Sequence, residues 1–148
     1  MAILFLEKTP GFTLRKKREL KKWIKDAVAS ENRICGDITF VFESDEKVYR
    51  VNVEYLGHEW YTDVISFNYQ TGEEVGGDII ISVDRVRENA LKYDVAFELE
   101  LRRVMIHGVL HLAGYDDGTE EERRNMMRLE DKYLDLWRKK EEKKDGKV

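Results

Sequence analysis

Two histidines four residues apart open the most chemically informative stretch of the chain, which runs from His107 to Asp117 and reads HGVLHLAGYDD. On a helix, side chains at this spacing project from one face, one turn apart, so two neutral ring nitrogens can meet on one divalent cation. Gly114 can end the helix because glycine adopts the left-handed conformation easily. The chain can then bring Asp117 back towards His107 and His111. Two imidazoles and one carboxylate would leave a coordination position open, as in a catalytic zinc site.

The histidine pair could instead have a purely structural role, because buried histidines often only form hydrogen bonds. The chain has only three histidines, and two of them fall in this pattern, followed by a helix stop and two carboxylates. This combination favours metal binding. Gly108 stands where the HExxH motif of zinc proteases has its glutamate, so the general base of those enzymes is missing and peptide hydrolysis is disfavoured.

The same stretch resembles the signature of the YbeY family of bacterial rRNA maturation endoribonucleases, which usually reads HGxLHLxGYDH. Ten of the eleven positions agree, counting the two free ones, and the family's third histidine is Asp117 here. This motif is highly specific.

A second block, Asn52 to Phe67, is similar to the family's N-x-x-Y-R-x-x-D-x-P-T-D-V-L-S-F. Leu56 stands where the family usually has arginine, and Tyr61 where it usually has proline. Gly77-Asp78-Ile79 followed by Ser82 also resembles a family strand, so the resemblance covers nearly the whole chain. The positions of the second block that match the family are Asn52, Tyr55, Thr62, Asp63, Val64, Ser66 and Phe67.

The resemblance implies a single-strand-directed, metal-dependent endoribonuclease that acts in 16S rRNA 3′-end maturation and ribosome biogenesis. Its expected partners are rRNA and the small ribosomal subunit in the cytoplasm, with no membrane and no DNA. We expect His107, His111 and Asp117 to bind one Zn²⁺, although two histidines and a carboxylate also suit iron, and nickel stays open. Asp116 is a candidate for orienting a ligand or handling a proton, or else a simple turn residue. Leu56 cannot contact a phosphate, so the arginine's role in RNA handling is in doubt.

Two other functions stay open. The protein could be a ribosome assembly factor whose metal is mainly structural, or a metal-dependent hydrolase of amide bonds. RNA cleavage that a chelator abolishes and metal restores would select the nuclease over the assembly factor.

Composition predicts one soluble domain over residues 1–148. Charged residues make up 38% of the chain and the net charge is −4, with no apolar run near the ~20 residues that span a bilayer. The single cysteine, Cys35, permits no internal disulfide and suits a reducing cytoplasm.

Net acidity argues against a general attraction to nucleic acid, so any RNA-binding surface must be local. One basic segment could be such a surface, and Arg15, Lys17, Lys21 and Lys25 are its candidate RNA contacts. The alternative is a solvated helix face. The cations of the segment are Arg15, Lys16, Lys17, Arg18, Lys21, Lys22 and Lys25.

Patterning predicts an α+β fold, with a roughly four-stranded sheet, about five helices, and the metal site at the end of a buried central helix. No regular βαβ rhythm is visible. The predicted strands are Ile3–Leu6, Asp37–Glu43, Asp63–Tyr69 and Asp78–Val83.

The helices are predicted from apolar stripes and capping residues. Val95–Ala113 is apolar on most sides, which predicts a buried helix. The predicted helices are Leu14–Ser30 capped by Thr13, Ser44–Gly57, one from Ser82 or Asp84 to Lys92, Val95–Ala113 capped by Asp94, and one opened by a Thr119–Glu122 capping box.

Overall fold

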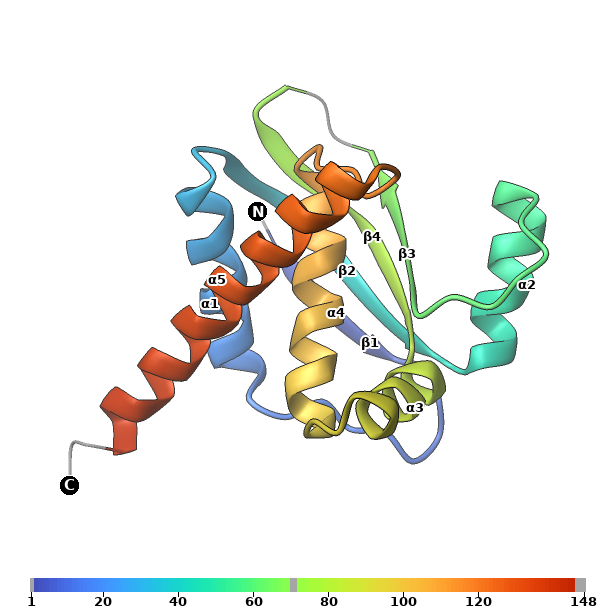
Figure 1. Cartoon of the computed structure of the whole chain (residues 1–148), viewed down its shortest axis with the longest axis horizontal. Helices are drawn as coiled ribbons and strands as arrows, with labels where there is room; N and C mark the ends of the chain where they lie inside the picture. Colours follow the sequence, from blue (N-terminus) through green and yellow to red (C-terminus); the bar gives the residue numbers. More distant parts are fainter. Residues whose placement is uncertain (1, 70–71, 146–148) are drawn as a thin grey trace.

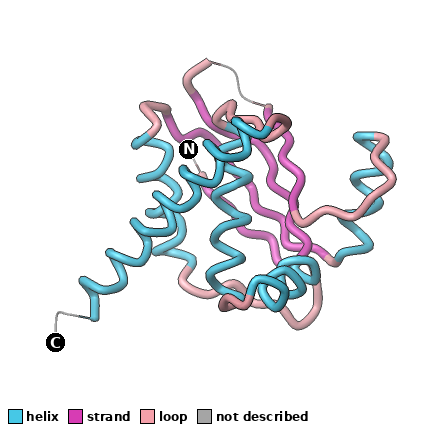
Figure 2. The backbone as a smooth tube through the Cα atoms, viewed as in Figure 1, coloured by secondary structure: helices cyan, strands magenta, loops and turns pink. Residues whose placement is uncertain are grey.

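Within residues 2–69 and 72–145, which the computed structural model describes, four strands form one mixed sheet in the order β1-β2-β4-β3 (Figure 2). β1 pairs with β2 and β2 with β4 in parallel, whereas β3 runs antiparallel to β4. The strands are β1 (Ile3–Glu7), β2 (Ile34–Glu43), β3 (Val64–Asn68) and β4 (Glu74–Ser82).

The same described residues form five helices, so the α+β expectation of about four strands and five helices is confirmed. β1, α1 and β2 nevertheless make one βαβ unit, because two parallel strands need a crossover connection. The helices are α1 (Lys17–Ser30), α2 (Asp45–Leu56), α3 (Val83–Tyr93), α4 (Phe97–Leu112) and α5 (Glu120–Asp145). None of the helices described is both long and apolar enough to cross a membrane.

α4 is the central helix of the molecule. It lies across one face of the sheet and contacts β3 and β4, while α1, α3 and α5 pack around it (Figure 1). The predicted burial of this helix is confirmed, since nine of its sixteen residues are buried. α2 lies beside the β3 edge of the sheet, where it contacts β3, β4 and α3 (Figure 1).

Gly108 lets α4 lie unusually close to the sheet. A Cβ atom at this position would lie 2.6 Å from Cγ2 of Ile79 on β4, closer than real Cβ contacts occur. The Ser66 hydroxyl of β3 donates to the Gly108 carbonyl at 3.2 Å, and the Asn68 amide donates to the Leu112 carbonyl at 3.2 Å. The carboxyl-terminal half of α4 is therefore fixed on β3 and β4.

Two predicted helix caps are wrong. Thr13 does not cap α1, which begins at Lys17 after Lys16 adopts a left-handed conformation with φ 58°. Buried Phe12 and Leu14 hold the preceding segment against the core in a non-helical path, and the Leu14 N–H donates to the Glu7 carboxylate.

Asp94 ends α3 in a left-handed conformation with φ 54° instead of capping α4, which follows Ala96. The other caps are confirmed, because Ser44 and Ser82 accept N–H bonds at the starts of α2 and α3. Thr119 and Glu122 make the predicted reciprocal pair, with distances of 2.9 and 3.1 Å.

Replacing Gly108 with alanine should destabilise the protein. The added methyl group must push Ile79 or the whole of α4 away, and overpacking of this kind costs about 1–3 kcal/mol. Urea unfolding followed by circular dichroism measures the difference in free energy of unfolding.

The matched test is a double-mutant cycle with Ile79→Ala, which removes the atom that clashes. The double variant should be more stable than the sum of the two single losses indicates. Strict additivity would mean that the close approach at Gly108 is not the source of the loss.

Candidate metal centre

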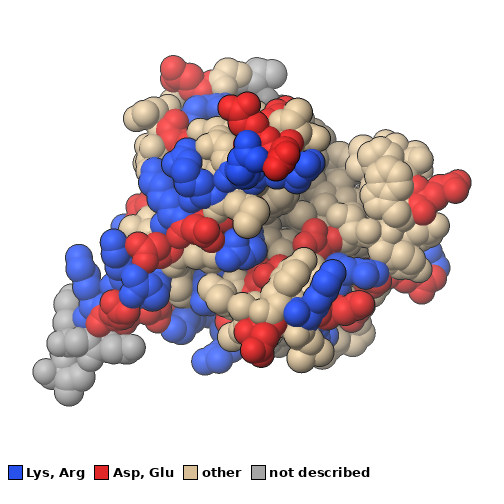
Figure 3. Space-filling view, viewed as in Figure 1, with Lys and Arg blue, Asp and Glu red and all other residues tan. Residues whose placement is uncertain are grey.

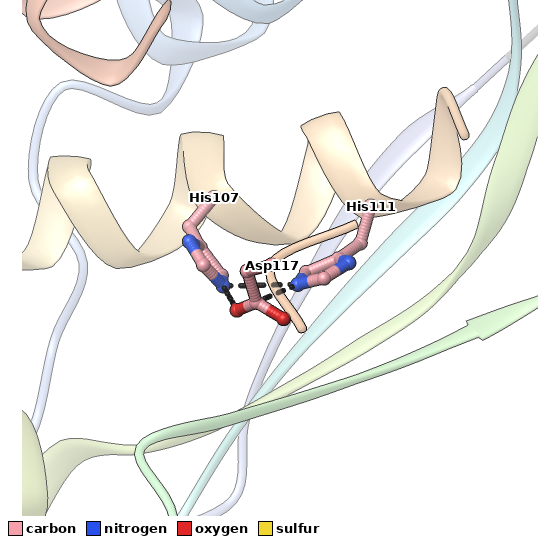
Figure 4. Close-up of side chains that lie close together, drawn as sticks. All are labelled: His107, His111 and Asp117. Atoms are coloured by element: carbon pink, nitrogen blue, oxygen red, sulfur yellow. Dashed lines mark hydrogen bonds and ion pairs between the residues drawn. The ribbon is translucent and has the colours of Figure 1, made fainter. Parts of the chain in front are cut away.

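His107 and His111 project from one face of α4, and Asp117 approaches them from the loop that follows (Figure 4). The two Nε2 atoms are 3.0 Å apart. Oδ2 of Asp117 lies 3.3 Å from Nε2 of His107 and 3.4 Å from Nε2 of His111. Three side chains predicted from spacing are thus brought together, with one donor atom from each within 4.8 Å of the others.

This set of donors fits a small tetrahedral cation. Ligand atoms about 2.0–2.2 Å from a tetrahedral zinc ion are roughly 3.4 Å apart from one another. The observed separations of 3.0 to 3.4 Å are close to that value. Two nitrogens and one carboxylate oxygen are also ligands that zinc accepts.

The end of α4 turns the chain back towards the histidines. Gly114 has φ 102°, and its N–H bonds to the His111 carbonyl at 3.0 Å. Arg33 donates to the Ala113 carbonyl at 2.6 Å, and the Tyr115 hydroxyl donates to Glu31. The predicted glycine stop is therefore present, and contacts from the α1–β2 region hold the loop that carries Asp117.

Glu130 on α5 is a site residue that sequence reasoning missed. Its carboxylate lies 2.6 Å from Nδ1 of His107, and Arg103 donates to its other oxygen at 3.2 Å. A proton held on Nδ1 leaves the Nε2 lone pair of His107 facing Asp117 and His111. The sequence signal for it is an acidic residue on the apolar face of α5, one helical turn after Met126, where an apolar side chain is expected.

The pKa values of this region follow from burial and from Glu130. Burial lowers the pKa of His107, but the hydrogen bond and charge of Glu130, with the charges of Asp117 and Asp63, together outweigh it, so the net pKa is raised. A proton therefore competes with a cation for His107 at higher pH than for an ordinary histidine. Burial raises the pKa of Asp63, whose carboxylate accepts from Asn89 at 3.3 Å.

The cluster of His107, His111 and Asp117 lies in a cleft of about 730 Å³. The walls come from α2, the α2–β3 loop, β3, α3, α4 and the start of α5. Asp63 and Ser66, which the family resemblance marks, line this cleft, and so does His58, which stacks on Trp60. The side chains of the cluster are 22%, 25% and 43% exposed, so solvent reaches them.

Asp116 is placed differently from Asp117. Its side chain is exposed and is not among the residues that line the cleft. The catalytic role predicted for it stays a prediction, whereas Asp63 and Glu130 line the cleft together with the two histidines and Asp117.

The basic segment also lies away from the metal cleft, whose lining includes no residue of α1. Lys17 pairs with Glu7 at 3.2 Å, and the Lys21 ammonium lies 5.9 Å from the Phe5 ring centroid. Arg15 lines a separate cleft of about 630 Å³ between α1, α4 and α5. Lys25 lies farther along α1, the helix that also carries Lys17 and Lys21. RNA contacts by these four residues stay predictions.

Comparison with known proteins gives one consistent result. A family model described as "Endoribonuclease YbeY" matches residues 7–138. The chain is similar to Endoribonuclease YbeY of Christiangramia forsetii, with 44% identity over 85% of this chain and 88% of that protein. It is 46% identical to Endoribonuclease YbeY of Bacteroides thetaiotaomicron, over 80% of this chain and 87% of that protein. The solution structure of TM1509 from Thermotoga maritima superposes with a TM-score of 0.69 at 28% identity, covering 97% of this chain and 93% of that one.

The contact between Glu130 and His107 predicts a role in metal affinity. Glu130→Gln removes the charge that orients His107, and loss of such a partner typically weakens metal binding ~10–100-fold. Competition with a fluorescent chelator measures the affinity, and unfolding midpoints check the fold.

Asp131→Asn is the matched control. Asp131 is the next residue and also contacts Arg103, at 3.3 Å, but its side chain is 65% exposed. This variant should bind metal like the wild type. Equal affinity in all three proteins would show that Glu130 does not orient His107.

Proposed function

The chain belongs to the YbeY family, and from that premise we propose that it is a single-strand-directed, metal-dependent endoribonuclease that hydrolyses phosphodiester bonds in RNA. The convergence of His107, His111 and Asp117 at a solvent-accessible cleft is the observation that carries this proposal. A metal held by three side chains keeps a free position, as hydrolytic sites require.

Zinc is the metal that we propose, because its ligand types and its tetrahedral spacing both suit the cluster. Iron and nickel are the alternatives for this set of donors. When bound, a divalent cation here would stabilise negative charge on a phosphoryl oxygen and lower the pKa of a water that reaches it.

The side chains around the three candidate ligands can orient a ligand, hold a proton or contact a phosphate. Glu130 holds the His107 ring and its tautomer, and Arg103 holds Glu130. Asp63 is better placed than Asp116 to hold or release a proton, because it lines the cleft and burial raises the pKa of its carboxyl. Arg123 lies on the α5 side of the cleft wall, and its guanidinium can approach a phosphate from there.

The biological task that we propose is 16S rRNA 3′-end maturation in the cytoplasm, with rRNA and the small ribosomal subunit as partners. The family to which the chain belongs supports this assignment. An assembly factor with a mainly structural metal is the alternative, but a structural zinc site is normally closed by four protein ligands. The described residues gather three donors in an open cleft.

Amide hydrolysis of the HExxH type has a specific obstacle. A glutamate at position 108 would meet Ile79, since even a Cβ atom there lies 2.6 Å from that side chain. The general base of those proteases is therefore disfavoured on this face of α4, because Ile79 or the helix would have to move to make room for it. This packing favours the nuclease.

The direct test combines metal analysis with RNA cleavage on the same sample. Protein purified without an affinity tag or added metal should contain one zinc per chain and cleave unstructured RNA. A chelator should abolish cleavage and zinc should restore it. Undiminished cleavage after complete metal removal would contradict the proposal, as would cleavage of peptides without cleavage of RNA.

His111→Ala and Asp117→Ala should each lose metal and RNA cleavage together, because each removes one of three ligand atoms. We expect metal affinity to fall by more than ~10-fold, since losing a direct ligand costs at least as much as losing an orienting partner. Elemental analysis and cleavage rates provide the measurements.

His58→Ala serves as the control for metal content. His58 lines the same cleft but is outside the cluster of three. It should retain the metal. Full metal content in Asp117→Ala would instead remove Asp117 from the ligand set and direct attention to Asp116.

The basic helix gives a separate prediction. Replacing Lys17, Lys21 and Lys25 with glutamine should weaken RNA binding and reduce the slope of log K against log salt by up to about 2, because fewer counterions are released. Binding titrations at several salt concentrations measure the slope. An unchanged slope would mean that these lysines form only a solvated helix face.

A further inference from the structure

Large apolar side chains stand in solvent at the rim of the metal cleft. Trp60 is 57% exposed, Tyr93 56% and Leu56 43%, and all three line the cleft that holds His107 and His111. They come from three places in the chain: the end of α2, the α2–β3 loop and the end of α3. Exposed apolar surface that is continuous with a cleft typically marks a binding site.

Trp60 is held in its exposed position. The Asn52 side chain, buried in α2, donates to the Trp60 carbonyl at 2.8 Å. The His58 ring stacks on the indole with a centroid distance of 4.2 Å and an interplanar angle of 14°. His58 thus supports the indole by stacking on it, while Trp60 as a residue stays more than half exposed to solvent. An aromatic ring held in this way loses little conformational freedom when a ligand binds.

Apart from a bound cation, the side-chain charges of the cleft give little attraction to a phosphate backbone. Its lining carries four carboxyl groups and only two guanidinium groups, those of Arg103 and Arg123. Arg103 already pairs with Glu130 and Asp131, at 3.2 and 3.3 Å. The carboxyl groups are those of Asp63, Glu100, Asp117 and Glu130.

Leu56 adds to this shortage of positive charge, since it occupies the position where the family pattern has arginine. The rim therefore offers apolar surface at a point where an ionic contact to RNA is expected. Figure 3 shows the recess beside the lobe formed by α2, and the α2 side of that recess is uncharged in this view.

We propose that Trp60, together with Leu56 and Tyr93, forms a platform on which bases of unpaired RNA stack as the strand enters the metal cleft. This inference rests on the proposed nuclease function and identifies how that site recognises its substrate. In a duplex the bases are stacked on one another, whereas unpaired bases can stack on aromatic rings. Base stacking then supplies affinity that the charges of the cleft do not supply, and it selects single strands.

The platform is tested by equilibrium binding of the metal-loaded protein to a labelled, unstructured RNA of ~12 nucleotides, a length within the usual range for one single-strand site. A second probe is the same strand with abasic positions, which keeps the phosphates and removes the bases. Fluorescence anisotropy at several salt concentrations measures both affinities, and a denaturing gel checks that the RNA stays intact.

Wild-type protein should bind the abasic strand roughly tenfold more weakly than the intact strand. Trp60→Ala should bind the intact strand roughly tenfold more weakly than the wild type, with an unchanged salt slope, because no phosphate contact is lost. It should also discriminate less between the two strands. Trp60→Phe should keep most of the affinity.

Tyr61→Ala is the matched control in the same loop. Tyr61 is 52% exposed, but it stacks on Tyr49 and lies under the Arg85 guanidinium instead of lining the cleft. Equal losses in the Tyr61 and Trp60 variants would trace the effect to the loop and overturn the platform. Unchanged RNA binding in Trp60→Ala would also overturn the platform and would point to a protein partner for the rim. A wild-type protein that binds no RNA would overturn the platform in the same way.

The two proposals fail separately. Chelator-sensitive RNA cleavage with Trp60-independent binding would leave the nuclease standing and remove the platform. Trp60-dependent binding without metal-dependent cleavage would leave the platform standing and remove the nuclease.

Discussion

The close packing of α4 on β4 is the constraint on which the rest of the site depends. Because Gly108 has no side chain, the helix backbone can approach Ile79, and hydrogen bonds from Ser66 and Asn68 fix the same half of the helix to β3. This contact directs His107 and His111 into the cleft beside β3. It also disfavours a glutamate at position 108, so one packing requirement both positions the candidate metal ligands and separates this site from zinc proteases of the HExxH type.

Carboxylates organise the chemistry around the histidines. Glu130 is nearly fully buried, and its two carboxylate oxygens are bonded to the His107 ring and to the Arg103 guanidinium. Asp117, in contrast, is partly exposed and comes from a loop held by Arg33 and Tyr115. The buried carboxylate fixes a ligand in place, and the exposed one can complete the site. A carboxylate in place of the family's usual third histidine reduces the net charge of the metal site by one unit.

The cleft wall formed by α2 and the α2–β3 loop comes from the region where this chain departs from the family pattern. Leu56 replaces a cation and Tyr61 replaces a proline, yet the loop is held by the Asn52 side chain and by two aromatic contacts. His58 stacks on Trp60, and Tyr61 stacks on Tyr49 of α2. An acidic cleft with an apolar rim would recognise RNA through base faces more than through phosphate charge. The basic helix lies away from this cleft, with Lys17 exposed on the surface, and its attraction for the strand stays a prediction.

The sequence by itself determined the features that depend on local geometry. The spacing of His107 and His111, the helix stop at Gly114 and the caps at Ser44, Ser82 and Thr119 follow from the helix repeat and from backbone preferences over a few residues. Only the tertiary structure decided which distant groups meet. Glu130 reaches His107 because α5 packs across α4, and Trp60 and Tyr93 share a rim because the α2–β3 loop and the end of α3 meet at the same cleft. Thr13 fails as a cap because Phe12 and Leu14 are buried beside it. Burial of apolar surface determines which elements pack together, and it outweighs local capping preferences. The residue pattern of a single segment does not show which distant segment will pack against it.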